Sequence, residues 1–324
     1  MNARANGLQN GSQTTARRIL HFKESGILIA LVFLAVTLSV STNKFLTPYN
    51  VGIVIRQVSF VAIVALGQTL VLLTGGIDLS VGNMAGFCSI AAALMMVSTK
   101  IDPYLCTIIG MLMGLALGTI SGFLIARVGL NAFIATLGMG EVFAGLVLVI
   151  TKGYPITGIP AKFRFLGQGM LGLVPVPVII MLVITAIFAY VLKFTPYGRH
   201  IYAIGGNELA SRLVGIRVIR IKISVYAISG MLSALAGIIF VSRMNAGQPT
   251  IGPSWLMPSV TAAIIGGTTL SGGEGTVVGT IIGAIFMGVL ANGIVLLDIS
   301  AYWERVIIGA VVVAAVIIDI LRKR

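Results

Sequence analysis

The chain is dominated by long apolar runs that alternate with short polar segments. Ten of these runs approach or reach the roughly 17 to 25 residues that cross a bilayer as a helix. They cover residues 26–41, 51–73, 84–98, 105–126, 131–150, 176–194, 223–242, 257–270, 276–292 and 302–320. We therefore predict an all-α polytopic membrane protein with about ten transmembrane helices, forming one domain over residues 26–320. An eight-crossing alternative makes the short runs 84–98 and 257–270 re-entrant.

The distribution of basic residues predicts the orientation of these crossings. Lysine and arginine near helix ends gather on the cytoplasmic side. Most of them fall on one side when both ends are cytoplasmic, namely in the tail 1–25, the loop 195–222 and the basic end 321–324. We predict this arrangement. The paired arginines at 17–18 and the small residues at 39–41 leave a cleavable signal peptide as an alternative, but cleavage would put the basic C-terminus on the wrong side.

Composition supports the membrane assignment. The chain of 324 residues is 57% hydrophobic and 10% charged, against roughly 25% charged in a soluble domain. Its 40 glycines suit transmembrane helices, where small residues allow close backbone approach. A net charge of +13 would suggest a nucleic-acid partner in a soluble chain, but this apolar excess predicts a lipid bilayer as the partner instead. Both cysteines, Cys88 and Cys106, fit buried apolar positions.

The chemistry of enzymes is largely missing from the sequence. The chain has no His-Glu-x-x-His motif and no Gly-Lys pair, which excludes those zinc and phosphate-binding motifs. We predict no catalytic residue, no metal site and no cofactor in this chain, so nucleotide hydrolysis must come from another chain. A secondary carrier would be expected to bury carboxylates along its path. Only Glu141, near the centre of a run, and Asp78, in a glycine-flanked break, meet that expectation, so a carrier stays possible.

Two glycine-rich segments interrupt apolar runs and share the pattern Gly-Gly-x-x-Leu-Ser-x-Gly, at residues 75–82 and 266–273. A glycine pair breaks a helix and frees backbone groups, which is tolerated at depth only against protein or a watery cavity. The candidate residues of the first break are Gly75, Gly76, Asp78 and Ser80. We expect Asp78 and Ser80 to cap the following helix.

Glycine also recurs every four residues at 110–122 and at 275–283. Such a spacing places glycine along one side of a helix and predicts close helix packing. We expect both stripes to pack within the chain.

Neutral polar residues inside or beside the runs are candidates for a solute path. We select Asn131, Thr136, Gln248 and Asn292, together with Glu141. Neutral donors and acceptors suit an uncharged, hydroxylated solute. Interhelical hydrogen bonds would explain most of them equally well.

Two loops are long enough to have a function of their own. The loop 151–175 contains three prolines, and we expect it to be a folded external lid rather than a linker. The inner loop 195–222 alternates apolar and basic residues at helical spacing. This pattern fits an amphipathic helix on anionic lipid or a docking element for a cytoplasmic partner.

Several longer motifs carry a resemblance to a known family. They are TGGIDLSVG at 74–82, AFIATLG at 132–138, YGR at 197–199, IYAIGGNE at 201–208 and QPT at 248–250, completed by the glycine-rich segment 266–283. With these motifs in this order, the chain resembles the permease subunit of a bacterial ATP-binding-cassette importer for monosaccharides, from Phe45 to Asp319.

The resemblance implies a helical bundle with broken helices in the bacterial cytoplasmic (inner) membrane. It implies four kinds of partner: a second permease copy, identical or closely related, cytoplasmic ATPase domains that hold ATP and magnesium, a periplasmic or lipid-anchored sugar-binding protein, and lipid. The imported class would be a pentose or hexose, with a stand-alone secondary sugar carrier as the alternative. The particular sugar does not follow from the resemblance.

The resemblance also implies that the inner loop couples the permease to the ATPase. The matching residues are Gly205, Gly206, Asn207, Glu208, Ala210, Arg212, Leu213, Gly215 and Ile216. Leu209 stands where relatives often carry alanine. We predict one docking helix over 205–216, with Glu208 capping its start or pairing with a partner cation. Gly215 would permit a turn or a close approach at its end.

Two further expectations concern charged residues. Many relatives have arginine before the glycine of the fifth helix, whereas this chain has Ala144 before Gly145 and introduces Glu141. Because a carboxylate facing lipid is costly, we expect Glu141 to face the bundle interior, to pair with a donor or to take up a proton. It would then line or border the path, with a structural hydrogen bond as the alternative role. On the outer side, we expect Arg164 and Arg243 to bind carboxylates of the sugar-delivery protein.

Overall fold

The computed structural model describes residues 25–99 and 101–322. Most of the predicted tail 1–25, and half of the predicted basic end 321–324, lie outside the described residues. The described part is helical apart from one short hairpin. The helices are α2 (Ser25–Ser41), α3 (Pro48–Leu73), α4 (Val81–Ser98), α5 (Pro103–Phe123) with its π-helical end η1 (Leu124–Val128), α6 (Ala132–Thr151), the 3₁₀ turn η2 (Ala161–Phe163), α7 (Arg164–Gln168), α8 (Val176–Phe194), α9 (Pro196–Gly206), α10 (Glu208–Leu213), α11 (Val218–Met244), α12 (Pro253–Ile265), α13 (Val277–Leu296) and α14 (Ala301–Arg322).

Seven described helices are long and apolar enough to cross a membrane: Pro48–Leu73, Val81–Ser98, Pro103–Val128, Ala132–Thr151, Val176–Phe194, Val218–Met244 and Val277–Leu296. Two apolar helices among the described residues, Gly26–Ser41 and Pro253–Ile265, are shorter. The protein is thus an all-helical membrane protein, as predicted. Of the two runs that the eight-crossing alternative made re-entrant, the first forms a helix of spanning length and the second does not.

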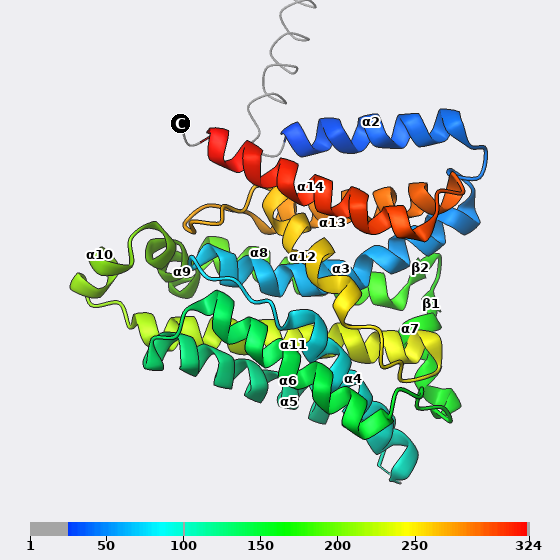
Figure 1. Ribbon diagram of the computed structural model, residues 1–324, viewed down its shortest axis with the longest axis horizontal. Coiled ribbons are helices and arrows are strands. Elements are labelled where there is room, and N and C mark those ends of the chain that lie inside the picture. The colour runs from blue at the N-terminus through cyan, green and yellow to red at the C-terminus, as the bar shows by residue number, and fades with distance from the viewer. Residues whose placement is uncertain (1–24, 100, 323–324) are drawn as a thin grey trace, which may run out of the picture.

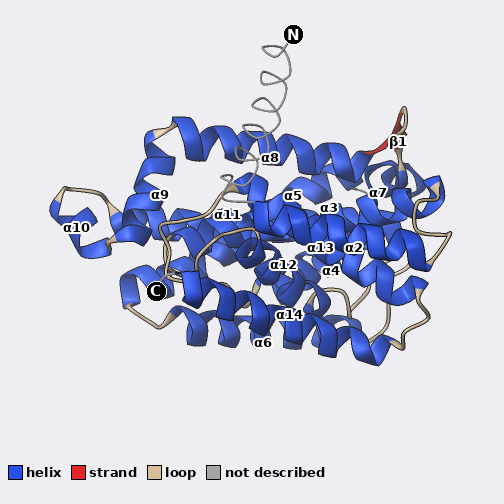
Figure 2. Ribbon diagram, turned by 90° about the horizontal axis from the view of Figure 1, so that it is seen from above, coloured by secondary structure: helices blue, strands red, loops and turns tan. Residues whose placement is uncertain are grey.

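The long helices run roughly side by side, so most of them begin or end at one of two opposite ends of the molecule (Figure 1). At one end α9 and α10 project from the bundle, and at the other lie α7 and the antiparallel hairpin of β1 (Met170–Leu171) and β2 (Val174–Pro175). The view from above shows the same separation, with the hairpin far from α10 (Figure 2). The long helices α3 and α11 are the most deeply buried spans. The first apolar run packs into the bundle, where Leu38 of α2 is buried against Gly293 of α13.

The glycine stripe at 110–122 packs α5 directly against α11. A methyl group at Gly114 would lie 2.5 Å from the Gly230 carbonyl oxygen, and one at Gly118 would lie 2.3 Å from the Tyr226 carbonyl oxygen. The second stripe does the same for α13, since a methyl group at Gly283 would lie 2.0 Å from a backbone oxygen of α12. Both seams therefore lie within the chain, which confirms the prediction.

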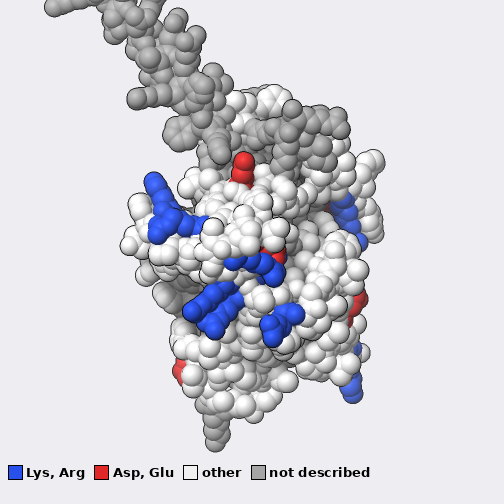
Figure 3. Space-filling view, turned by 90° about the vertical axis from the view of Figure 1, so that its left-hand side faces the viewer, with Lys and Arg blue, Asp and Glu red and all other residues white. Residues whose placement is uncertain are grey.

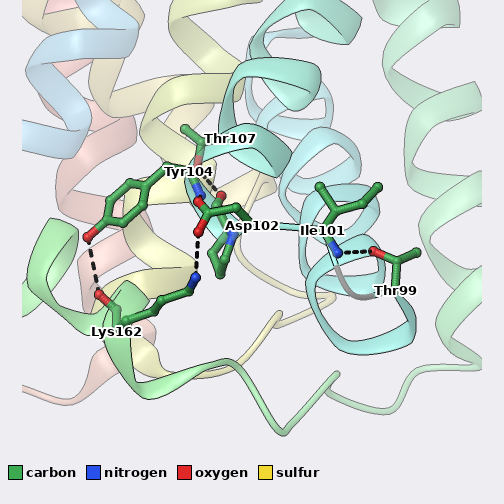
Figure 4. Close-up of polar contacts among 7 residues, drawn as sticks. Thr99, Ile101, Asp102, Tyr104, Thr107 and Lys162 are labelled. Carbon is green, nitrogen blue, oxygen red and sulfur yellow. Dashed lines mark hydrogen bonds and ion pairs between the residues drawn. The ribbon is translucent and has the colours of Figure 1, made fainter.

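The segment 151–175 is folded onto neighbouring elements. Its Ile156 forms a two-way backbone bridge with Gly247, at 2.8 Å in each direction. Lys162 forms an ion pair with Asp102 at the start of α5, and the Tyr104 hydroxyl donates to the Lys162 carbonyl oxygen at 3.2 Å (Figure 4). These contacts join the loop to α5 and to the segment between α11 and α12.

Candidate functional site

The break between α3 and α4 is built around the buried carboxylate of Asp78. Its Oδ1 accepts hydrogen bonds from the Ser80 backbone N–H at 3.0 Å and from the Ser80 hydroxyl at 2.6 Å. Asp78 therefore stabilises the turn that leads into α4, but its hydrogen bonds go to Ser80 and Ser229 and not to a backbone N–H of α4, so the prediction that it caps the helix was wrong. Ser80 occupies the N-cap position, but its side chain makes no capping hydrogen bond to α4. Its hydroxyl is directed to Asp78 instead, which corrects the prediction that Ser80 caps the helix.

Polar side chains of α3, α6 and α11 surround this break. The Ser229 hydroxyl of α11 donates to Asp78 Oδ2 at 3.3 Å, and the Tyr226 hydroxyl donates to the Ile77 carbonyl oxygen at 3.2 Å. Thr136 of α6 accepts from the Leu79 N–H at 3.0 Å. The side-chain amide of Gln68 in α3 also binds the backbone of Asp78. Its oxygen accepts from the Asp78 N–H at 3.3 Å, and its nitrogen donates to the Asp78 carbonyl oxygen at 3.2 Å. The break is therefore held by protein, as its depth requires.

The glycines of this break have distinct physical roles. Gly75 has a φ of 74°, a backbone conformation that favours glycine. Gly76 makes room for a neighbour, because a methyl group there would lie 2.5 Å from the Tyr226 hydroxyl oxygen. Tyr226 and Ser229 were not among the predicted site residues. Their spacing of three residues, which places both on one side of a long and largely apolar helix, was the signal that could have found them.

The predicted docking helix 205–216 is two elements in the structure. Gly205 and Gly206 end α9, and the extended backbone of Asn207 separates α9 from α10. Asn207 Oδ1 accepts from the Ala210 N–H at 2.9 Å, so Asn207 caps α10. Both the single helix and the capping role of Glu208 were wrong, because Asn207 is the better placed N-cap residue.

Glu208 pairs with two cations of this chain. Its carboxylate accepts from Arg212 at 2.6 Å and also binds Lys222 at the start of α11. Burial alone would raise the pKa of Glu208, but the hydrogen bonds from Lys222 and Arg212 outweigh it and lower this pKa. Because the pKa of Glu208 is lowered in the folded protein, its two ion pairs stabilise the loop at pH values above 4.5, the ordinary pKa of this side chain. This stabilisation is lost as the pH falls through the folded pKa.

The tip of this loop exposes apolar side chains at the end of the bundle. Leu209, Leu213 and Val214 are 69%, 81% and 76% exposed, whereas Ser211 on the opposite side is buried. Gly215 ends α10 with a φ of 86°, and nothing lies within 4 Å of a methyl group placed on it. Its role is therefore the predicted turn and not a close approach within this chain. Ile216 follows, half-buried, and its N–H donates to the Ser211 carbonyl oxygen at 3.0 Å.

The same end of the molecule is strongly basic. The view onto it shows several patches of lysine and arginine and few carboxylates (Figure 3). The exposed cations of the elements that reach this end are Arg127, Lys193, Arg199, Arg212, Arg217 and Arg220. An exposed apolar tip among such cations is suited to a partner with an apolar pocket and an acidic rim.

Three of the predicted path residues make contacts that hold helices. Asn131 caps α6, accepting from the Phe133 N–H at 2.9 Å. Asn292 of α13 and Asn50 of α3 exchange two amide hydrogen bonds of 2.9 Å each. Thr136 binds the first break, as described above. Gln248 is half-buried next to the bridge formed by Gly247.

Glu141 lies on the exposed side of α6, at its middle. The expectation that it faces the interior of this chain's bundle is therefore wrong. No hydrogen bond or ion pair joins the Glu141 side chain to another residue that the structure describes. Gly138 and Gly145, on the same side of the helix, have nothing within 4 Å of an added methyl group.

The two outer arginines have different surroundings. Arg164 is exposed, and its Nε donates to Asn245 at 3.0 Å. Arg243 is half-buried and points inward, where it donates to Gln57 at 2.7 Å and lies over the Phe60 ring at 5.6 Å. The described residues hold no group of three or more side chains that could bind a metal ion.

Comparison with known proteins identifies the family. A family model described as "Branched-chain amino acid transport system / permease component" matches residues 50–316. The chain is 43% identical to the ribose import permease protein of Bacillus subtilis, over 95% of this chain and 97% of that protein. It is also 43% identical to the ribose import permease protein of Haemophilus influenzae, over 90% and 91% of the two chains.

A more distant relative, the D-allose transport system permease protein of Escherichia coli, is 34% identical over 90% of this chain and 89% of its own length. No solved structure gives a significant match. The family model and these relatives agree on a permease, which confirms the resemblance and decides against a stand-alone carrier. The chain belongs to the permeases of bacterial ATP-binding-cassette importers, a family of multi-pass inner-membrane subunits that transport without catalysing a reaction themselves.

Proposed function

We propose that this chain forms the membrane path of an importer for a neutral monosaccharide. The observation that carries the coupling to a separate ATPase is the tip of α10, with its exposed Leu209, Leu213 and Val214 on a basic face. The relatives named for ribose and D-allose support a pentose or hexose as cargo. Neutral side chains such as Gln57 and Gln248 at the outer end fit a hydroxylated, uncharged solute.

The arrangement that follows from this proposal has ten crossings and both termini in the cytoplasm. Residues 26–320 form one permease domain, with 195–222 on the cytoplasmic side and 151–175 outside. The opposite placement of α10 and the hairpin in Figure 1 supports the two loop positions. ATP and magnesium belong to the ATPase chains, and the sugar arrives on a periplasmic or lipid-anchored binding protein.

We expect Leu213→Glu to weaken ATPase association by about tenfold or more, because it puts a charge into the apolar contact. The measurement is co-purification of the ATPase subunit with the permease from the membrane, together with sugar uptake. Leu173→Glu is the matched control, since Leu173 is 94% exposed in the hairpin at the opposite end. Normal ATPase association with the Leu213 variant would contradict the assignment of α10 as the docking helix.

The exposed carboxylate of Glu141 supports a second permease copy. A carboxylate that faces lipid at mid-span is costly, and the open glycines Gly138 and Gly145 beside it admit another helix at close range. We infer that the second copy covers this face of α6, and that Glu141 borders the path between the two copies.

Glu141→Gln is therefore expected to lower sugar uptake severalfold while leaving the stability of the single chain almost unchanged. The substitution keeps the shape of the side chain and breaks no contact with the described residues. Uptake across the pH range from about 5 to 8 tests the role of the charge. Glu304→Gln, at the start of α14, is the control. Unaltered uptake over this range would exclude a role for the charge.

The delivery protein is proposed to bind at the end that carries the hairpin. Arg164 presents an exposed guanidinium there, suited to a carboxylate. Arg243 was selected for the same task, and in this structure its guanidinium is engaged by Gln57. We therefore assign the first contact to Arg164 and propose that Arg243 becomes available only when that hydrogen bond opens.

Arg164→Glu is expected to weaken binding of the delivery protein at low salt and to matter less at high salt. Exposed charges steer association and are screened over about 8 Å at physiological ionic strength. Binding to membranes is measured at both salt concentrations, with Lys152→Glu in the same loop as control. Equal binding of the wild type and the Arg164 variant at low salt would remove this arginine from the interface.

A further inference from the structure

Three glycine-containing backbones meet at the base of the α9–α10 projection. Gly205 of α9 lies against the last residue of α3, where a methyl group on Gly205 would be 1.9 Å from the Leu73 carbonyl oxygen. The same methyl group would be 2.3 Å from the Gly273 nitrogen. The Gly273 N–H in turn donates to the Leu73 carbonyl oxygen at 3.0 Å. Gly205 thus rests on the hydrogen bond that joins the end of α3 to the second glycine-rich break.

The two breaks also touch each other at this point. A methyl group on Gly272 would lie 2.7 Å from the Gly75 nitrogen and 2.9 Å from the Gly205 α-carbon. The two segments that share the Gly-Gly-x-x-Leu-Ser-x-Gly pattern therefore lie against each other in the structure. No side chain separates the three backbones, so a displacement of one is passed directly to the others.

A side-chain contact reinforces this junction. The Tyr202 hydroxyl, one turn before Gly205 in α9, donates to the Gly275 carbonyl oxygen at 2.9 Å. Gly275 directly precedes Thr276, the N-cap residue of α13. Helix α9 is therefore attached to the end of α3, to the second break and to the start of α13.

From the same junction a continuous set of contacts leads to the proposed path. The first break begins at the end of α3, and its Leu79 N–H binds Thr136 of α6 at 3.0 Å. Glu141 lies little more than one turn further along α6. The loop that carries the ATPase-docking tip is thus connected to the exposed face of α6 through packed backbone and buried hydrogen bonds.

We propose that Gly205 is the positioning residue that transmits movement of the docking helix to both helix breaks. This inference rests on the proposed coupling to an ATPase. ATPase closure would shift α10 and α9 together, and the contact at Gly205 would move the end of α3 and the second break as one unit. The hydrogen bond from Tyr202 to Gly275 would move the start of α13 together with them.

The test compares Gly205→Ala, Tyr202→Phe and a control, Gly52→Ala in α3, where nothing lies within 4 Å of the added methyl group. The complex of permease, ATPase and delivery protein is reconstituted in vesicles, and the amount of sugar imported per ATP hydrolysed is measured. We expect this ratio to fall about tenfold for the Gly205 variant and about threefold for the Tyr202 variant, within the range for residues that carry coupling. ATPase association should stay within about twofold of the wild type.

A wild-type ratio of sugar to ATP in the Gly205 variant would overturn the proposal. If that variant fails to insert, the Tyr202 variant decides, because it keeps the ring and removes one hydroxyl, and a wild-type ratio there would overturn the proposal equally. Loss of ATPase association in step with uptake would show a structural role only and would also overturn it. Failure of the unmodified permease to bind an ATPase would instead refute the proposed function, which is a separate result.

Discussion

Replacing Gly118 with leucine is expected to leave little folded protein in the membrane. The first added carbon would lie 2.3 Å from the Tyr226 carbonyl oxygen and 3.0 Å from the Ala227 α-carbon. Both are backbone atoms of the central helix α11, which cannot yield as a flexible side chain would. Forcing the two helices apart would expose the whole seam and cost about 3 kcal/mol or more. The measurement is the amount of monodisperse protein recovered in mild detergent, and its melting temperature.

The control for this substitution is Gly309→Leu in α14. Gly309 is also helical, but it is exposed and has nothing within 4 Å of an added methyl group. Both variants add the same apolar side chain to a membrane helix, so their hydropathy changes equally. A recovery and melting temperature as low for the control as for the Gly118 variant would show that added bulk alone, and not the seam with α11, is responsible.

The glycine seams were predictable because their signal is local and periodic. A glycine at every fourth position marks one side of a helix whatever its neighbours are. The ends of the helices were harder to predict from the sequence. The apolar run 257–270 becomes the shorter helix Pro253–Ile265, because the pair at Gly266 and Gly267 ends it and Gly267 adopts a φ of 94°. Hydropathy does not register such a stop, since glycine and leucine both continue an apolar run.

The side of α6 on which Glu141 lies could not be read from the sequence. In a soluble helix the polar side faces water, so periodicity identifies the buried side. In lipid, the exposed and buried sides are both apolar, and the pattern loses this information. The pairing of Asn50 with Asn292 was hidden for a different reason, because the two residues are 242 positions apart. Nothing in the sequence around either asparagine indicates that the other is its hydrogen-bond partner.

The inner loop shows how a correct pattern can give an incomplete structure. The alternation of apolar and basic residues predicted a helix with an exposed apolar side, and α10 has one at Leu209 and Leu213. The division into α9 and α10 depends on Asn207, a residue type that favours N-cap positions. This signal was present in the sequence. The contact of Glu208 with Lys222 of α11 was not, because only the fold brings these two residues together.

Replacing Asp78 with alanine is expected to destabilise the break between α3 and α4 strongly. The carboxylate accepts from the Ser80 N–H, the Ser80 hydroxyl and the Ser229 hydroxyl, and all three donors are buried. Alanine would remove the acceptor and leave these donors to find other partners. Each buried donor left unsatisfied costs about 1–3 kcal/mol. We expect a loss of about 3 kcal/mol or more, seen as a large fall in the melting temperature of the detergent-solubilised protein.

Asp78→Asn separates the loss of the acceptor from the loss of charge. The asparagine oxygen can accept from Ser80 as Oδ1 does, and its amide nitrogen can donate to the Ser229 hydroxyl, which is also an acceptor. This variant should therefore melt closer to the wild type than Asp78→Ala. Asp102→Ala is the control for removing a carboxylate, because Asp102 forms an ion pair with Lys162 and caps α5 through the Tyr104 N–H, and both contacts are exposed and contribute less than buried ones. If Asp78→Ala melts no lower than Asp102→Ala, the hydrogen bonds at Asp78 do not hold the first break together, and the path from Leu73 through this break to α6 loses its rigid middle step.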